Sequence, residues 1–206
     1  MAANGVFCLE GEWNADLRKR ESVLPMLDLL ERLGELKAIH RDVATTSELE
    51  HYLTTWAQRR YEDYPVLYLA THGDKGLLHW SRGQETTLGE LADLLNESAA
   101  GCYVYLGSCL TLFDTKGAQR FVEKTGVEAL MGYRREVDWT EGAALDVILL
   151  SWLANHGGRP ETLHNQLMAR HGDLAKLYKF VTVTKRAVLR AQDYSKPAKS
   201  TSTGVS

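Results

Sequence analysis

The sequence predicts an α/β fold, a three-layer α/β/α sandwich around a mostly parallel sheet. Short apolar runs of strand length alternate with longer segments whose apolar residues recur at helical spacing. The run from Val66 to Ala70 is continuously apolar, which is typical of a parallel strand covered by helices on both faces. Right-handed crossovers between such strands place helices on both sides of the sheet.

The first part of the chain contains two strand–helix units. Their expected segments are strand 5–12, helix 16–34, strand 35–43 and helix 45–63. The spaced apolar residues of the first helix are Leu24, Leu27, Leu30 and Leu33. Ser47 and Glu50 have capping-box spacing, which predicts the start of the second helix.

The rest of the chain continues this alternation. We expect strand 64–73, a small extended excursion at 77–80, a helix from about 88, strand 102–109, helix 115–126, a strand within 127–139, helix 141–158 and a helical segment 159–180. Gly157 and Gly158 are the expected stop of the long helix. The stretch 181–185 fits either a last edge strand or more helix.

Length and composition indicate one domain over residues 1–191, followed by a disordered tail over 192–206. The 206 residues carry a net charge of −3, with 24 Lys and Arg against 27 Asp and Glu and no basic stripe. Nucleic acid is therefore not expected as a main partner. No apolar run approaches the roughly 18 residues that cross a bilayer, and no signal-peptide pattern is present. We expect a cytoplasmic protein without membrane contact.

The three cysteines, Cys8, Cys102 and Cys109, form neither a CxxC pair nor an even disulfide set, which fits a reducing compartment. Free cysteine is among the most buried residue types, so we interpret Cys8 and Cys102, which lie within or at the start of strands, as packing residues. Cys109 differs because it follows its apolar run. Ligands bind at this carboxyl edge of an open parallel sheet.

His72 follows the neighbouring apolar run in the same way, which predicts a His–Cys pair. Adjacent strands lie about 4.8 Å apart, so the two side chains can approach each other. A thiol is only a few per cent thiolate at neutral pH, and a nearby histidine can activate it and later protonate a leaving amine. The N–H groups of Gly73 and Cys109 are candidates for an oxyanion hole, so the catalytic candidates are His72, Cys109 and Gly73.

The segments "VLYLATHG" and "YVYLGSC", separated by an excursion and one helix, resemble the caspase-like clan of cysteine peptidases. This clan includes caspases, metacaspases, separases, gingipains, clostripain and the bacterial CHAT proteases. The resemblance covers roughly residues 5–155 and implies a caspase-like fold and a His72–Cys109 dyad. The caspase signature Q-A-C-[RQG]-G is absent, since residues 107–111 read GSCLT. A single-chain CHAT-like or separase-like endopeptidase therefore fits better.

In this clan the residue before the scissile bond enters a pocket near the first strand, the nucleophile strand and the loop after the fifth strand. The acidic candidates for that pocket are Glu10, Glu12, Asp138 and Glu141. By the resemblance, Asp138 or Glu141 would bind an Arg or Lys side chain, and Ser108 is a further candidate for substrate contact. By the same resemblance, Arg134 and Arg135 are candidates for acidic-residue specificity, because a basic residue after that strand serves Asp recognition in caspases. Specificity for a basic residue is the favoured interpretation. The simpler alternative for the two acidic residues is that they stabilise a helix N-terminus.

No cofactor is expected. The other histidines show no metal-ligand spacing and no phosphate-binding glycine motif follows the first strand. We interpret these histidines as solvated or core residues, although His79 is a candidate for lining a substrate groove. Trp80 and Trp139 are further candidates for that groove, but packing at an exposed edge is the favoured interpretation for both. The expected partner is a protein or peptide substrate, with a separate activator protein suggested by the small size. Bacterial members of the clan often act in defence or cell-death pathways.

Two alternatives remain. The same strand-end edge could belong to a non-catalytic α/β module that binds a protein or a small ligand. Another thiol hydrolase, such as an amidase, is less consistent with the sequence because the histidine of those enzymes usually follows the cysteine, whereas His72 precedes Cys109.

Overall fold

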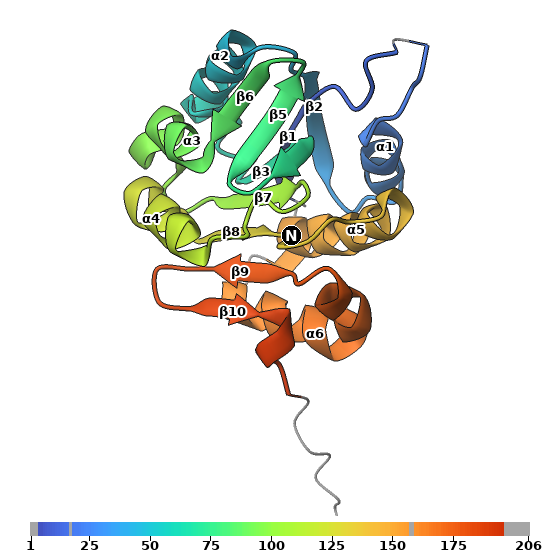
Figure 1. The fold of residues 1–206 in the computed structure, drawn as a ribbon, viewed down its shortest axis with the longest axis vertical. Coiled ribbons are helices and arrows are strands. Elements are labelled where there is room, and N and C mark those ends of the chain that lie inside the picture. Colours follow the sequence, from blue (N-terminus) through green and yellow to red (C-terminus); the bar gives the residue numbers. More distant parts are fainter. Residues whose placement is uncertain (1–3, 17, 157–158, 196–206) are drawn as a thin grey trace, which may run out of the picture.

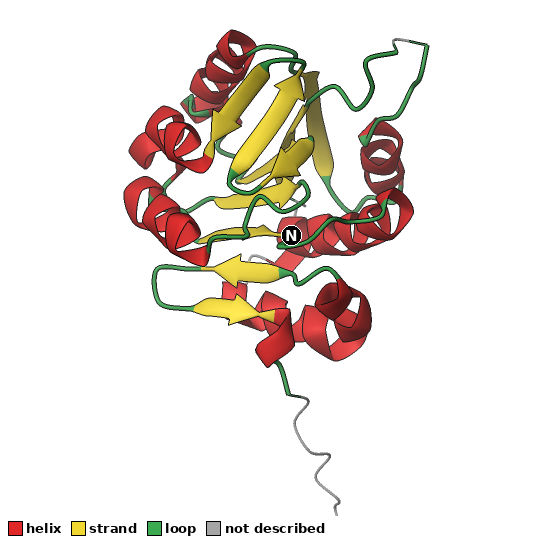
Figure 2. Ribbon diagram, in the orientation of Figure 1, coloured by secondary structure: helices red, strands yellow, loops and turns green. Residues whose placement is uncertain are grey.

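A seven-stranded sheet forms the centre of the protein (Figures 1 and 2). The computed structural model describes residues 4–16, 18–156 and 159–195. In spatial order the strands are β10 (Val188–Arg190), β9 (Val181–Val183), β8 (Ala129–Gly132), β7 (Tyr103–Gly107), β3 (Val66–Ala70), β1 (Gly5–Glu10) and β2 (Lys37–Asp42). The pairs among β2, β1, β3, β7 and β8 are parallel, whereas β9 and β10 are antiparallel.

Helices cover both faces of this sheet, which confirms the predicted α/β three-layer architecture (Figure 1). One face carries α1 (Leu24–Arg32), α5 (Trp139–His156) and α6 (Pro160–Leu177). The other face carries α2 (Thr46–Trp56), α3 (Leu88–Leu95) and α4 (Thr115–Thr125). The central strands β1, β3 and β8 are buried along their whole length because they are covered on both sides.

The predicted excursion after the third strand is a small antiparallel sheet. Its strands are β4 (His72–Asp74), β5 (Leu77–Ser81) and β6 (Gln84–Thr87). Trp80 is fully buried beneath this sheet, and its indole N–H donates to Thr86 Oγ1 at 3.0 Å. Trp80 is thus a core residue and lines no groove. His72 pairs with His79 across the β4–β5 ladder, so the predicted histidine lies on a strand of its own rather than at a loose strand end.

Two predicted helix starts are wrong. The first helix begins at Leu24 and not at 16, because Pro25 occupies its first turn, where proline is favoured. The capping box of α2 is formed by Thr45 and Glu48, two residues before the predicted pair. Thr45 is the residue with extended backbone, so its hydroxyl can accept from the Glu48 N–H.

The end of the domain lies within the predicted tail. Residues 181–183 form strand β9, which pairs with β8 on one side and with the edge strand β10 on the other. A short 3₁₀ turn at Ala191–Asp193 then follows, with Ala191 buried and Tyr194 packed against the core on the α5 side. The remaining predicted tail, 196–206, and the predicted stop at Gly157 and Gly158 lie outside the described residues.

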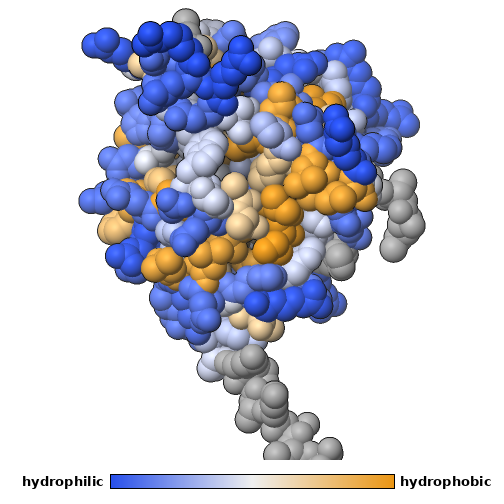
Figure 3. All heavy atoms as spheres, turned by 90° about the vertical axis from the view of Figure 1, so that its right-hand side faces the viewer, coloured by the Kyte–Doolittle hydropathy of each residue, from blue (hydrophilic) through white to orange (hydrophobic). Residues whose placement is uncertain are grey.

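Apolar surface gathers on the side of the molecule that carries α1 and α5 (Figure 3). α1 buries Leu27 and Leu30, whereas Leu29 and the following Leu33 are 48% and 64% exposed. Among the helices that the structure describes, none has the length and apolar character needed to span a membrane.

Buried His164 on α6 gives a testable pH dependence. Burial lowers its pKa from 6.5 to about 4, and its Nδ1 lies 3.0 Å from Thr182 Oγ1. The folded state favours the neutral ring. The contribution of His164 to the free energy of unfolding is therefore fully present above pH 6.5 and is lost as the pH falls towards 4. The wild type should lose about 3 kcal/mol more unfolding free energy than His164→Gln between pH 7 and pH 4.

Urea unfolding at several pH values measures this difference. The control is His51→Gln, which removes an exposed histidine and should keep the wild-type pH dependence. Equal pH dependence in the wild type and His164→Gln would contradict the prediction.

Candidate active site

The pairing of β3 with β7 brings the two predicted catalytic residues to the same edge of the sheet. Ala70 is in register with Gly107, and His72 and Cys109 each lie two residues beyond that pair. Both side chains line one pocket with an empty volume of about 480 Å³. The lining residues are Trp13, Val23, Tyr68, Thr71, His72, Gly107, Ser108, Cys109, Tyr133, Val137, Asp138, Trp139, Gly142, Ala143 and Asp146.

The ring of His72 is oriented by a backbone carbonyl. Its Nε2 lies 2.8 Å from the carbonyl oxygen of Trp13, and its ring contacts the Trp13 indole edge to face, with centroids 5.1 Å apart. A carbonyl only accepts, so Nε2 carries the proton in this bond. In the neutral ring, Nδ1 is then the atom that can accept a proton.

Cys109 is half-buried, and its sulfur contacts the loop between β8 and α5. The Val137 N–H donates to Sγ at 3.3 Å, and Sγ lies 3.9 Å from the Val137 carbonyl. Burial raises the pKa of the thiol above 9.0, although the Val137 N–H acts in the opposite direction. The thiol is therefore protonated at neutral pH in this arrangement. The sulfur's hydrogen bonds within the described chain go to Val137 rather than to His72.

The segment after Cys109 is fixed in an unusual backbone conformation. Leu110 has φ of 57°, a left-handed conformation that is uncommon for a non-glycine residue. Its N–H donates to the carbonyl of Arg135 at 3.2 Å. Thr111 is fully buried, and its hydroxyl lies 2.7 Å from that of Ser108 and 3.3 Å from the Leu77 carbonyl. The cysteine loop is thereby tied to both the β8–α5 loop and the small sheet.

Two glycines at the site are required by close packing. A Cβ on Gly107 would lie 2.7 Å from the Tyr68 ring, so the residue two before the cysteine has no room for a side chain. A Cβ on Gly73 would lie 2.3 Å from Thr111 Oγ1 and 2.5 Å from the Cys109 carbonyl oxygen. Gly73 thus brings the histidine strand into direct contact with the cysteine loop. Its role as an oxyanion donor stays a prediction.

A buried carboxylate that the sequence reasoning missed lies at the pocket. Asp146 on α5 accepts hydrogen bonds from Tyr68 at 2.7 Å, from Tyr133 at 3.1 Å and from Tyr105. Burial raises the pKa of Asp146, and the three phenols oppose that shift by stabilising the charged form. The available signal was its position as the one charged residue in the apolar run 142–150.

Of the predicted substrate-binding residues, the structure places two at the pocket. Asp138 lines it, while its Oδ1 accepts the N–H groups of Thr140 and Glu141, so it also caps α5 as the simpler alternative had it. Ser108 lines it but is buried and bonded to Thr111. Glu141 accepts the Tyr178 hydroxyl outside the pocket.

The four remaining candidates, Glu10, Glu12, Arg134 and Arg135, also lie outside that lining. The Glu10 carboxylate faces α1 and β2, where it accepts several hydrogen bonds. Arg134 bonds to the Phe113 carbonyl, and exposed Arg135 faces another surface. Trp139 is 45% exposed and lines the pocket as predicted for a groove residue.

The other histidines and cysteines largely match their predicted interpretation. Cys8 is fully buried, which raises its pKa, and Cys102 packs partly against the core on the α2 side. His164 is a core residue, whereas His79 is partly exposed and bonds to Glu85.

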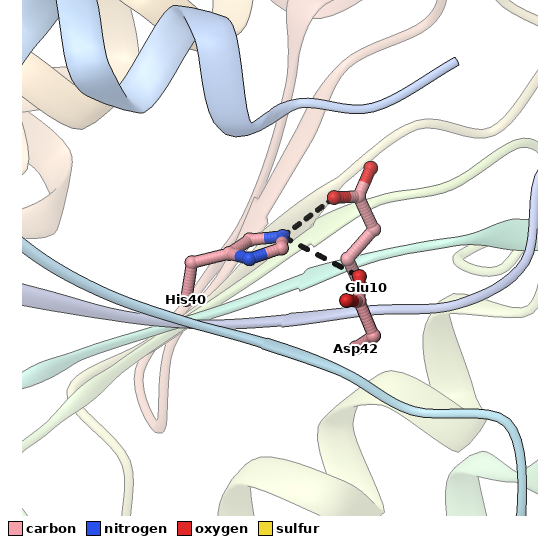
Figure 4. A group of neighbouring side chains, drawn as sticks. All are labelled: Glu10, His40 and Asp42. Carbon is pink, nitrogen blue, oxygen red and sulfur yellow. Dashed lines mark hydrogen bonds and ion pairs between the residues drawn. The ribbon is translucent and has the colours of Figure 1, made fainter. Parts of the chain in front are cut away.

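Among the described residues, Glu10, His40 and Asp42 form a group of possible metal ligands (Figure 4). His40 Nε2 lies 2.6 Å from Glu10 Oε2 and 4.0 Å from Asp42 Oδ1. The Glu10 carboxylate already accepts four hydrogen bonds, which fill its lone pairs. A hydrogen-bonded His–Glu pair accounts for the group without a metal.

The fold and site define an α/β protein with a histidine and a cysteine at the carboxyl edge of its sheet. The matching family model is described as "Family of unknown function (DUF6642)" and covers residues 3–182. The chain belongs to this family. No curated protein matches it.

Substitution of Gly73 tests the contact between the histidine strand and the cysteine loop. Gly73→Ala should lower the free energy of unfolding by about 1–3 kcal/mol, because overpacking forces backbone shifts. The clash involves backbone at Cys109 and a buried threonine, neither of which can move freely. Urea unfolding measures the loss.

The matched control is Gly89→Ala at the start of α3, where a Cβ meets only Thr87 Oγ1 at 3.7 Å. This variant should be neutral or slightly stabilising, since alanine favours helix. Equal stability of the two variants would refute the close contact.

Proposed function

We propose that the protein is a cysteine endopeptidase of the caspase-like type in which Cys109 is the nucleophile and His72 the general acid–base. The observation that carries the proposal is that both residues line one pocket, each two positions beyond the end of one of two neighbouring strands. Orientation of His72 by the Trp13 carbonyl supports it, because the ring then offers Nδ1 as the proton acceptor.

In the proposed reaction, Cys109 Sγ attacks the peptide carbonyl carbon while Nδ1 of His72 takes the thiol proton. The Val137 N–H that donates to the sulfur stabilises the thiolate. The tetrahedral oxyanion is stabilised by the N–H groups of Gly73 and Cys109. Collapse breaks the C–N bond, and His72 gives its proton to the departing amine. Water then hydrolyses the thioester and restores the thiol.

The charges of the pocket support cleavage after a basic residue. Asp138 and Asp146 are among its lining residues, and that lining includes no lysine or arginine in the described chain. The indoles of Trp13 and Trp139 meet edge to face with centroids 4.6 Å apart, and they offer apolar contact to a long side chain. A cationic end group would then meet the Asp146 carboxylate in a poorly solvated environment, where opposite charges attract strongly.

Replacement of the nucleophile is the direct test. Cys109→Ala should abolish cleavage of an Arg/Lys peptide library, because no other described thiol lines the pocket. Release of a fluorescent leaving group measures the rate. Cys102→Ala is the matched control, since Cys102 packs against the core on the α2 side of the sheet.

Loss of activity in Cys109→Ala with retained activity in Cys102→Ala is the expected result. Circular dichroism should show that both variants keep the wild-type fold. Cleavage by folded Cys109→Ala at the wild-type rate would eliminate the proposed nucleophile.

Asp146→Asn tests the specificity of the pocket. It removes the charge and retains the size, so kcat/KM for Arg and Lys substrates should fall about 10- to 100-fold, as expected for loss of a buried ionic contact. Asp138→Asn removes the charge of the second carboxylate and keeps the helix cap. It should lower kcat/KM for Arg and Lys substrates by a smaller factor, because Asp138 is exposed.

Asp173→Asn is the control, because it makes the same change at an exposed position on α6 and should leave kcat/KM unchanged. Unchanged preference for basic substrates in both Asp146→Asn and Asp138→Asn would exclude these residues as the specificity determinants.

A non-catalytic binding module is the second candidate, and the raised pKa of Cys109 favours it. Iodoacetamide separates the two functions. An enzyme should alkylate at Cys109 faster than a free thiol, with a rate that depends on the protonation of a histidine. A rate no faster than that of a free thiol, without this pH dependence, would favour the binding module.

A further inference from the structure

We infer that Glu10 is a positioning residue that holds His72 in its reactive orientation through Trp13. The inference rests on the proposed function of His72. Glu10 is the last residue of β1, the strand next to β3, and its side chain is 3% exposed. It lies outside the pocket lining, so it acts on the histidine only through another residue.

The Glu10 carboxylate has a complete set of hydrogen-bond donors. Oε1 accepts the Trp13 indole N–H at 2.5 Å and the Val23 N–H at 2.7 Å. Oε2 accepts the Ser22 hydroxyl at 2.6 Å and lies 2.6 Å from His40 Nε2 (Figure 4). Four donors to one carboxylate form a rigid anchor, because each fixes a lone-pair direction.

The charged form of Glu10 is the form that this arrangement favours. Burial by itself raises the pKa of Glu10, but the hydrogen bonds from His40, Ser22, Trp13 and Val23 outweigh burial and lower it. An ionised carboxylate only accepts, so the Trp13 indole N–H cannot be exchanged for an acceptor group at this position.

Trp13 transmits this anchoring to the site. Its side chain is bonded to Glu10, while its backbone carbonyl accepts from His72 Nε2. Trp13 belongs to the long connection between β1 and α1, whose described residues form no helix or strand. The preceding Glu12 N–H donates to the Trp80 carbonyl, so the backbone is held on one side and the indole on the other.

Only one of the four donors, Trp13, is also hydrogen-bonded to His72. Ser22 and Val23 tie Glu10 to the start of α1, and His40 ties it to β2, whereas Trp13 ties it to His72. Removal of different donors can therefore separate a positioning role from a purely structural role. The structural role predicts equal effects on the histidine for every donor removed.

The experiment compares Glu10→Gln and Trp13→Phe with the control Ser22→Ala. Imidazole ¹⁵N NMR shifts report the tautomer of His72 without any substrate. The wild type should show the Nε2–H tautomer, and both Glu10→Gln and Trp13→Phe should show a mixture. The kcat of both variants should fall about 10- to 100-fold, since a displacement of about 1 Å at a catalytic group costs on the order of 10²-fold. KM should stay nearly unchanged in Glu10→Gln, whereas Trp13→Phe also alters the indole that is proposed to contact the substrate.

Ser22→Ala removes one donor to Glu10 and should destabilise the protein while leaving the His72 tautomer and kcat at wild-type values. A wild-type tautomer in Glu10→Gln, or the same tautomer change in Ser22→Ala, would overturn the inference. If Glu10→Gln does not fold, the result for Trp13→Phe tests the inference, because this variant removes the hydrogen bond from Trp13 to Glu10 and keeps the Glu10 carboxylate. The NMR result stands even if the wild type cleaves no peptide, which would refute the proposed function alone.

Discussion

The register between β3 and β7 is the constraint on which the site depends. In a parallel pair the strands end at the same edge, so Ala70 opposite Gly107 fixes His72 and Cys109 at equal heights above the sheet. A shift of one residue would turn alternate side chains to the opposite face. The sheet therefore sets the positions of the two residues, and the surrounding loops affect only the orientation of their side chains.

The buried Asp146 secures this register from one face of the sheet. Tyr68 on β3 stacks on Tyr105 on β7, with centroids 5.3 Å apart, and Tyr133 follows β8. All three phenols donate to the carboxylate, so a single side chain of α5 is bonded to β3, to β7 and to the residue that follows β8. A buried charge lowers the stability of the fold unless it is hydrogen-bonded. A shift in strand register that broke one of these bonds would therefore be destabilising.

The sequence predicted the sheet and the His72–Cys109 edge because both follow from local patterns. Apolar runs identify strands, and the first polar residue after each run identifies the carboxyl edge. The capping box at Thr45 was misplaced because several Thr, Ser and Glu residues with the same spacing lie close together in that segment. Sequence spacing alone does not identify the N-cap among them, because the N-cap is the residue with extended backbone.

The roles of Glu10 and Asp146 could not be predicted from spacing, because their partners come from distant segments. Trp13 is close to Glu10 in sequence, but Val23 lies across the long β1–α1 connection and His40 reaches Glu10 only across the β1–β2 pair. Both carboxylates are buried beside the same site, yet their donors differ. Asp146 has only neutral phenol donors and a raised pKa, whereas the donors of Glu10 include a histidine and its pKa is lowered.

The two carboxylates also differ in their capacity to accept a further hydrogen bond. Glu10 has no lone pair left for a ligand, so its charge serves the internal structure. Asp146 accepts three bonds and lines the pocket, so its carboxylate retains capacity for one more donor. A cationic substrate group would supply that donor and compensate the desolvated charge. A buried carboxylate that lacks one hydrogen-bond donor within the fold is a group to which a ligand can supply that donor.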